Sequence, residues 1–377
     1  MSPIRVGIIG LSAKPPGMAA GAWASSSLLP AFQKSPDYEI VALCNSSLEA
    51  AQRSIEFHQL PESTKAYGDP EQLANDHDVD LVVVSVVVTK HLQLALPALK
   101  KQKKKVFVEW PLGKSVEEAQ QMRDVAKANC VETIVGLQAR GDPCDIRLKE
   151  IIQSGEIGKV TSTTVLGAVP AFPPEFWTED TKQYLDIETG ANAFHVIFGH
   201  FLHSFTHALG NFDVDTISSL FHIDKPTVAV YTTNGGSIAD PAHPKTAPDD
   251  ILVQGKLENG AAASIVFRST QTPVEDVGLR WIITGTKGEV EVTSGTGNWQ
   301  ANTPTKKLKV RVFGSEAREV NVKTEGMADD LSRMERLGAN TAFILDAFAK
   351  GKREIYADFE AALENHVLLE EILKRAH

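Results

Sequence analysis

The sequence predicts an α/β protein with two domains: an N-terminal doubly wound parallel sheet, and a C-terminal α/β domain built on a large, open, mainly antiparallel sheet. Up to Arg140, short apolar runs alternate with helical patterns, whereas strand patterns dominate the remainder. The length of 377 residues also exceeds what one small core usually organises. We expect domains at 1–138 and 139–377, with C-terminal helices that can pack back on the first.

The strands expected in the N-terminal domain are short and uniformly apolar. Such runs indicate strands covered on both faces, which is typical of a parallel sheet between helices. Strands are expected at 4–10, 39–44, 80–88, 105–109 and 132–137, with helices near 23–33 and from Ser47, Lys90 and Ser115, where Glu118 completes a capping box.

The C-terminal domain begins with a helix at 144–154, which ends at Gly155. Turns at 258–260 and 286–288 indicate hairpins. Strands are expected at 160–166, 213–222, 228–231, 250–257, 261–267, 280–285, 289–293 and 308–313, helices at 193–209, 338–349 and 358–376, and long loops at 170–179 and 235–248.

Composition and charge narrow the class of protein. The formal charge of −10 argues against a direct nucleic-acid partner, and the basic run 100–105 is expected to be a solvated helix end. No apolar run approaches the roughly 18 residues that span a bilayer, so no membrane partner is expected. The start of the chain lacks a signal-peptide pattern, and the three cysteines lack metal-ligand spacing. We expect a cytoplasmic protein without a metal.

A glycine-rich turn follows the first expected strand. In a Rossmann domain, such a turn lets a pyrophosphate approach backbone N–H groups at a helix N-terminus. Gly10 takes the first position of the G-x-G-x-x-G pattern, Ser12 replaces the second glycine, and Gly17 and Gly21 lie in an enlarged loop. Because a strand precedes the turn and a helix follows it, dinucleotide binding is favoured over an ordinary glycine turn.

The end of the second expected strand bears on cofactor choice. Asn45, Ser46 and Ser47 stand where NAD-selective sites place an acid, and the next carboxylate is Glu49. Amide and hydroxyl groups can donate to a 2′-phosphate, so NADP is favoured and NAD remains open. The alternative is that these residues only cap the next helix.

Motifs spread over nearly the whole chain resemble the glucose–fructose oxidoreductase, inositol dehydrogenase and MocA family. They include GIIGL, DLVVVSVVVTKH, KKVFVEWPLGKSVEEAQ, IVGLQAR, IIQSGEIGKV and GTKGEVEV. Within the family, Glu109-Trp110, Leu-Gln-Ala-Arg at 137–140 and Phe-Gly-His at 198–200 resemble the fungal galactose-regulon repressor branch. The resemblance implies a Rossmann fold with a dinucleotide, and cofactor contacts from Leu11, Trp23, Val87, His91, Glu109, Trp110 and Gln138.

The same resemblance implies a changed catalytic centre. Family enzymes have Glu-Lys-Pro where this chain has Glu109-Trp110-Pro111, and an indole cannot serve as acid or base. The family's Asp and His on one helix correspond to Val196 and His200. Trp110, Arg140 and His200 are therefore expected to bind substrate, although a structural salt bridge is an equal alternative for Arg140.

The expected helix 193–209 is rich in histidine, with His195, His200, His203 and His207. Metal binding, acid–base catalysis and core packing are the alternatives. Core packing is favoured for His203 and His207. We expect His200 to relay the proton, with Tyr184 and His195 as further catalytic candidates.

Two functions from different classes follow. The first is an NAD(P)-dependent oxidoreductase acting on a hydroxyl, carbonyl or imine carbon of a small molecule, including a version in which Trp110 shapes the pocket for an apolar substrate. The alternative is a catalytically inactive dinucleotide-binding regulator with a protein partner. Family members commonly pair through the exposed face of the second sheet, so a homodimer or tetramer is expected.

Overall fold

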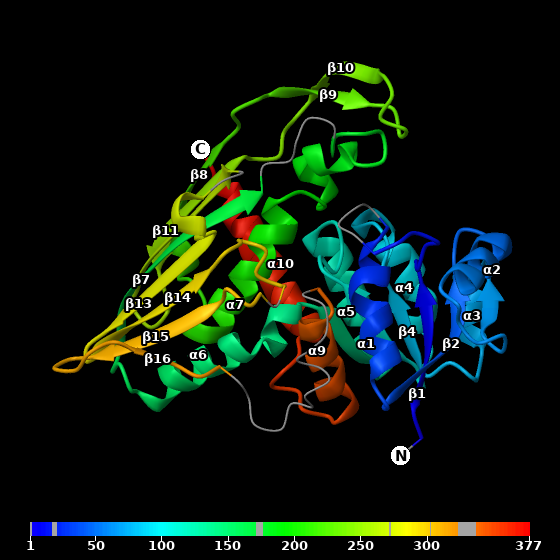
Figure 1. Cartoon of the computed structure of the whole chain (residues 1–377), viewed down its shortest axis with the longest axis horizontal. Coiled ribbons are helices and arrows are strands. Elements are labelled where there is room, and N and C mark those ends of the chain that lie inside the picture. Colours follow the sequence, from blue (N-terminus) through cyan, green and yellow to red (C-terminus); the bar gives the residue numbers. More distant parts are fainter. Residues whose placement is uncertain (1, 17–20, 171–175, 271–272, 302, 323–336) are drawn as a thin grey trace. The chain divides into compact units, whose positions relative to one another are not determined.

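The computed structural model describes the chain except for residues 1, 17–20, 171–175, 271–272, 302 and 323–336. The chain divides into two compact units. The first consists of Met1–Gly141 and Met327–His366, and the second of Asp142–Gly326 and Val367–His377. Figure 1 shows the elements of both.

A parallel sheet of six strands forms the centre of the first unit, in the order β3-β2-β1-β4-β5-β6 (Figure 1). This confirms the doubly wound N-terminal sheet. The expected strand 80–88 ends early, because after Val84 the apolar run continues into a 3-10 turn, η2 (Val88–Lys90). The strands are β1 (Ile4–Ile9), β2 (Tyr38–Cys44), β3 (Lys65–Tyr67), β4 (Leu81–Val84), β5 (Lys105–Glu109) and β6 (Glu132–Gly136).

Local capping defines several helices of this unit. Ser47 caps α2 through a hydrogen bond from the N–H of Ala50, and Ser115 caps α5 through one from Glu118, as the capping box predicted. The helix expected at 23–33 begins instead as a π-helical turn, η1 (Ala24–Leu28). The helices are α1 (Leu29–Lys34), α2 (Leu48–Phe57), α3 (Pro70–Asn75), α4 (His91–Leu99), α5 (Val116–Ala128), α9 (Ala339–Ala349) and the start of α10 (Phe359–Lys374).

Helix α9 returns to the first unit from the far end of the chain and packs beside α1. Its Phe343 and Ile344 are buried in one core cluster with Phe32 of α1 and Ile8 of β1. Gly141 also lies against this helix, where an added Cβ would come within 2.8 Å of Ile344. The hydrophobic core of the first unit therefore includes residues that lie more than three hundred positions after β1 in the sequence.

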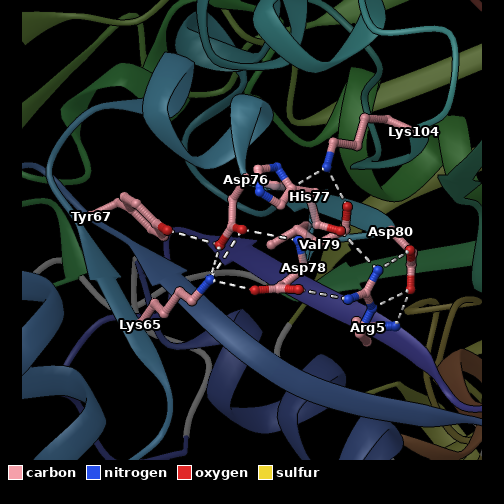
Figure 2. A network of polar contacts seen from close by, with 9 residues as sticks. All are labelled: Arg5, Lys65, Tyr67, Asp76, His77, Asp78, Val79, Asp80 and Lys104. Atoms are coloured by element: carbon pink, nitrogen blue, oxygen red, sulfur yellow. Dashed lines mark hydrogen bonds and ion pairs between the residues drawn. The ribbon is translucent and has the colours of Figure 1, made fainter.

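Charged side chains tie together the amino-terminal ends of the parallel strands (Figure 2). Arg5 binds Asp80 through Nε and Nη2 at 2.9 and 3.0 Å, and Lys65 lies 2.8 Å from Asp78 and 3.0 Å from Asp76. Lys104 is 9% exposed and donates to the backbone carbonyls of residues 76 and 79. The expectation that the whole basic run is solvated is therefore wrong for Lys104, because its ammonium satisfies buried carbonyl groups.

The second unit is built on a mixed sheet of eight strands, in the order β16-β15-β14-β13-β7-β12-β11-β8 (Figure 1). All neighbours pair antiparallel except β7 and β12, and the two expected hairpins are confirmed. The strands are β7 (Val160–Pro170), β8 (Ser218–His222), β11 (Asp250–Lys256), β12 (Ala262–Thr270), β13 (Leu279–Gly285), β14 (Gly288–Ser294), β15 (Lys307–Val312) and β16 (Arg318–Glu319).

Two expectations for this unit are wrong. Residues 235–248 were expected to be a loop, but β10 (Ile238–Pro244) pairs antiparallel with β9 (Thr227–Tyr231) through backbone hydrogen bonds that need no apolar pattern. The expected strand 213–222 begins only at residue 218, because Asp213 caps a 3-10 turn, η8 (Val214–Thr216), that precedes β8.

The inner face of this sheet is covered by helix α7 (Gly199–Leu209), which follows a π-helical turn, η7 (Phe194–Phe198). The Phe201 ring contacts those of Phe267, Trp281 and Trp299 at centroid distances of 5.2 to 5.4 Å. Helix α6 (Pro143–Ser154) is capped by Asp142 and ends at Gly155 with φ +72°. Among the described helices of the chain, none is long and apolar enough to cross a membrane.

Candidate functional site

The turn after β1 requires a glycine at position 10. Gly10 has φ +101°, and an added Cβ would lie 2.2 Å from the carbonyl oxygen of Ser85 at the end of β4. Its N–H donates to the carbonyl of Cys44 at the end of β2, at 3.1 Å. The turn therefore passes close over the carboxyl ends of three neighbouring strands, where open α/β sheets bind ligands.

The enlarged loop is closed by side-chain contacts. The hydroxyl of Ser12 donates to the carbonyl of Gly21 at 2.5 Å, and the carbonyl of Ser12 lies 2.8 Å from Nε2 of His58. Leu11 has a fully buried side chain, so only its backbone is available to a ligand. Gly17 lies outside the described residues. His58, at the end of α2, had not been singled out from the sequence.

Of the three residues after β2, two hold neighbouring backbone and one is exposed to solvent. Asn45 uses its amide group to hold the carbonyls of Leu11 and Ala50 and the hydroxyl of Ser54, at 2.9 to 3.3 Å. Ser47 caps α2, whereas Ser46 is exposed. The helix-capping alternative therefore holds for Ser47, and Asn45 fixes the glycine-rich turn to α2.

Glu109, the last residue of β5, is the centre of a buried hydrogen-bond cluster. Its Oε1 accepts from the indole N–H of Trp23 at 2.8 Å, and its Oε2 accepts from the amide of Gln138 at 2.9 Å. An added Cβ on Gly136 would meet Oε2 at 2.0 Å, so a larger residue at the end of β6 would displace this carboxylate. Burial raises the pKa of Glu109 to about 7, although both N–H donors oppose this shift.

Trp110 follows this carboxylate and is 5% exposed. Its ring centroid lies 4.6 Å from that of His366 on α10, a residue that the sequence reading did not single out. His91, expected beside the cofactor, is 1% exposed, and its ring nitrogens lie 2.9 Å from the carbonyl oxygen of Pro111 and 3.1 Å from that of Val86. His91 thus joins the segments after β4 and β5, where Val87 is half-buried.

Arg140 lies on a 3-10 turn, η3 (Gln138–Gly141), and its Nε donates to the carbonyl of Glu354 at 3.4 Å. Burial lowers the pKa of its guanidinium, and the charges of Asp358 and Glu364 counter this effect. The printed contact of Arg140 is thus a hydrogen bond to a backbone carbonyl within the first unit, and the salt-bridge alternative stays a prediction.

In the second unit, His195 is part of the π-helical turn η7 and His200 is in the first turn of α7. His195 is partly buried, and its Nδ1 lies 3.1 Å from Oδ1 of Asn192. His200 is 4% exposed. Burial lowers the pKa of His195 to about 4 and that of His200 to about 3, so both rings are neutral at pH 7.

The other polar candidates of this unit lie nearby in sequence. Tyr184 belongs to a 3-10 turn, η5 (Lys182–Leu185), where its ring stacks on Phe176 at 6.4 Å and burial raises its pKa. His203 is 5% exposed and stacks on His207, whose Nε2 lies 2.9 Å from Nζ of Lys149. His203 is thus buried in the core, as expected, whereas His207 is only half-buried and contacts a lysine ammonium.

The candidates therefore fall into two groups. The first unit brings together Gly10, Ser12, Asn45, Trp23, Glu109 and Gln138 along the carboxyl edge of its sheet. The second unit places His195 and His200 one turn apart, with Asn192 as a partner that the sequence reading did not identify. An Asn three residues before a His was the available signal.

The first group fits a dinucleotide. The close passage of the backbone at Gly10 leaves no side chain between the turn and a pyrophosphate, and helix η1–α1 follows the turn. Among the described residues, Oε1 of Gln138 is buried without a hydrogen-bond partner, which suits a donor from a ligand. Such a cofactor would supply hydride chemistry.

Comparison with known protein families gives two matches that together cover most of the chain. Residues 4–137 match an oxidoreductase family with an NAD-binding Rossmann fold. Residues 143–294 match the C-terminal domain of Gal80p.

Individual relatives include both a dehydrogenase and a regulator. Dehydrogenase aclE of Aspergillus oryzae is 31% identical over 317 residues, covering 83% of this chain and 82% of that protein. The galactose/lactose metabolism regulatory protein GAL80 of Kluyveromyces lactis is 30% identical over 304 residues, or 78% of this chain and 65% of that protein. A super-repressor mutant of Gal80p from Saccharomyces cerevisiae shares the fold, with a TM-score of 0.84 at 24% identity over 99% of this chain and 95% of that one.

Proposed function

Because the chain belongs to the oxidoreductase family with an NAD-binding Rossmann fold and a Gal80p-like C-terminal domain, we propose that it is an NAD(P)-dependent oxidoreductase. It moves a hydride between the nicotinamide and a hydroxyl, carbonyl or imine carbon of a small molecule. The buried cluster of Trp23, Glu109 and Gln138 at the carboxyl edge of the first sheet carries this proposal. This cluster holds together the segments that follow β1, β5 and β6, at the edge of the sheet where Rossmann folds bind the cofactor.

The proposed cofactor is NADP, with NAD as the alternative. Backbone N–H groups of the turn at 10–12 would face the pyrophosphate, and Asn45, Ser46 and Ser47 would lie near the adenosine ribose. The exposed hydroxyl of Ser46 can donate to a 2′-phosphate, and no carboxylate repels it before Glu49. Val87, His91, Glu109, Trp110 and Gln138 would line the nicotinamide side, with His91 acting through the loops that it holds.

The catalytic proposal names His200, Tyr184 and His195 for proton transfer. By the family resemblance, Trp110 takes the position of the lysine, and we propose Trp110 and Arg140 of the first unit, and His200 of the second, as substrate-binding residues. The protein would then supply binding, orientation and a proton path, while the cofactor supplies the hydride step. The test is a turnover screen of NADPH and NADP⁺ against polyols, sugars, ketones and imines. Turnover of any compound supports the enzyme, and saturable cofactor binding without turnover contradicts it.

A dinucleotide-sensing regulator is the second candidate function, and the environment of Trp110 favours it. The indole is buried against His366 and cannot relay a proton. The 30% identity to a named regulator supports the same candidate. The proposed partner of such a regulator is a regulatory protein. If this function is correct, the Trp110→Lys variant will bind the cofactor without gaining turnover. Gain of sugar or polyol turnover in that variant would support the oxidoreductase.

We also propose a homodimer or tetramer in the cytoplasm, assembled through the outer face of the second sheet. Leu166 and Leu220 on this face are 45% and 48% exposed. A shallow groove beside them is lined by small hydroxyl side chains, including Ser162, Thr164 and Ser264. Sedimentation velocity at micromolar concentration should show an oligomer, and a monomer would contradict this assembly.

A further inference from the structure

The glycine-rich turn after β1 does not lead directly into a helix. In the usual Rossmann fingerprint the helix opens within the turn, and its first turn orients the N–H groups that hold the phosphates. Here the helical turn η1 begins only at Ala24, and the described residues 11–16 are not helical. Contacts from elsewhere in the chain must therefore orient the peptide groups that follow Gly10.

Two side chains hold consecutive carbonyl groups of this segment. Nδ2 of Asn45, which also contacts α2 through Ser54, donates to the carbonyl of Leu11 at 2.9 Å. Nε2 of His58, at the C-terminal end of α2, lies 2.8 Å from the carbonyl oxygen of Ser12. Because a carbonyl oxygen can only accept, this nitrogen carries the hydrogen of the neutral ring. Both carbonyl groups therefore face the α2 side of the turn.

The direction of these carbonyl groups determines the direction of two N–H groups. In a planar trans peptide, the C=O and the N–H of the next residue point in opposite directions. The N–H groups of Ser12 and Ala13 therefore point away from α2. Within the described part of the chain, neither of them donates to a backbone carbonyl, and Ala13 is exposed. Successive N–H groups with a common direction form a concavity that binds anions.

This concavity lies at the place where the strand order of the first sheet reverses. Strand β1 ends directly before the turn, and it lies between β2 on the α2 side and β4 on the other. Doubly wound sheets bind the dinucleotide at such a reversal. We propose that His58, together with Asn45, is a positioning residue that turns the N–H groups of Ser12 and Ala13 toward the cofactor pyrophosphate, an inference that rests on the proposed function.

The first test examines the contact of His58 without any cofactor. Two-bond ¹H–¹⁵N spectra of the 377-residue chain, assigned by comparison with His58→Gln, should show a protonated Nε2 and an unprotonated Nδ1 at pH 8. A ring with an unprotonated Nε2 would overturn the proposal, whether or not a dinucleotide binds.

The second test is a fluorescence titration with NADPH. His58→Leu should weaken binding roughly tenfold, because the peptide group of Ser12 loses its side-chain donor. His58→Gln should restore most of the affinity, since its amide nitrogen is as many bonds from Cβ as Nε2 is. The matched control is His77→Leu, the same change at an exposed histidine near the amino-terminal ends of the strands (Figure 2), which should bind like the wild type.

Competition with NADH separates positioning from damage to the fold. Because the pyrophosphate is common to both dinucleotides, His58→Leu should weaken NADPH and NADH by the same factor. A changed ratio would place the effect at the adenosine ribose and would overturn the proposal. If the wild type binds but His58→Leu binds equally tightly, His58 is not a positioning residue and the proposed function stands. Absence of binding by the wild type would instead contradict the proposed function.

Discussion

The indole N–H of Trp23 donates to Oε1 of Glu109 over 2.8 Å and joins the helix after the glycine-rich turn to the end of β5. The other carboxylate oxygen accepts from Gln138 after β6. The segments that follow β1, β5 and β6 at the carboxyl edge of the sheet are therefore linked through one buried carboxyl group. Because this group is desolvated, its protonation state affects both the stability of the first unit and the shape of its ligand-binding edge.

The shifted pKa of Glu109 predicts a pH-dependent stability. Burial raises this pKa from 4.5 in the unfolded chain to about 7, so the folded state holds the extra proton between these values. The contribution of Glu109 to the free energy of unfolding is fully present below pH 4.5. It decreases by about 3 kcal/mol as the pH rises to about 7. In urea unfolding, Glu109→Gln should lack this loss. Equal pH slopes in the two proteins would contradict the burial of an ionisable group.

Gly10→Ala should abolish dinucleotide binding. The new methyl group would lie 2.2 Å from the carbonyl oxygen of Ser85, so the turn must move. Alanine is also strained at the φ of +101° that this position adopts. Gly260→Ala is the matched control, because that residue has φ +86° but no atom within 4 Å of the added Cβ. Both variants carry backbone strain of about 1 kcal/mol, and only Gly10→Ala adds the collision. NADPH titration of the two should separate these effects, and normal binding by Gly10→Ala would disprove the assigned turn.

The network in Figure 2 predicts a loss of stability in acid. Burial would raise the pKa of Asp76, but the backbone N–H of Asp78, the ammonium of Lys65 and the hydroxyl of Tyr67 together lower it to about 2. The contribution, about 1–2 kcal/mol after screening, is present above pH 4 and is lost as the pH falls to about 2. Asp76→Asn should remove it. Asp78→Asn, at a more exposed carboxylate, should change acid unfolding less, and the reverse order would contradict the network.

A buried ion cluster in the second unit predicts a large effect of Lys306→Met. Nζ of Lys306 lies 2.8 Å from Oδ2 of Asp142 and 3.9 Å above the Trp299 ring, and that indole donates to Asp145 at 2.9 Å. Removing the ammonium leaves two carboxyl groups in the core without a cation, which costs about 3–5 kcal/mol. The control Lys307→Met alters an exposed neighbour and should change unfolding by less than about 0.5 kcal/mol. Similar stability of the two variants would contradict the account of the cluster.

Sequence patterns predicted the elements whose stability comes from apolar burial. The strands β1, β2, β4 and β5 are mainly apolar, with buried residues toward their carboxyl ends, and the hairpins of the second sheet combine alternating strands with Gly-containing turns. By contrast, β3 and β10 are short or polar strands held by backbone pairing, which leaves no apolar pattern. The burial of Lys104 could not be predicted either, because the backbone carbonyls that its ammonium contacts are distant in sequence.

The candidate site was predicted less completely. The glycine turn and Glu109 follow from motif position, but the partners Trp23 and Gln138 lie 86 and 29 residues from Glu109 in sequence, and only the fold joins them. The π-turn could not be foreseen, because an extra residue in a helix changes which side chains share a face without a composition signal. For Asn192, the spacing of three residues before His195 was a usable signal.

A fluorescence titration of the 377-residue chain with NADPH and NADH tests the proposed dinucleotide site most directly. We expect saturable binding of at least one of them, tighter for NADPH, with quenching of indole emission because Trp23 belongs to the turn-side cluster. Gly10→Ala should eliminate this signal, and Gly260→Ala should retain it. Absence of binding by the wild-type chain to both dinucleotides would contradict the cofactor site, and with it the proposed oxidoreductase.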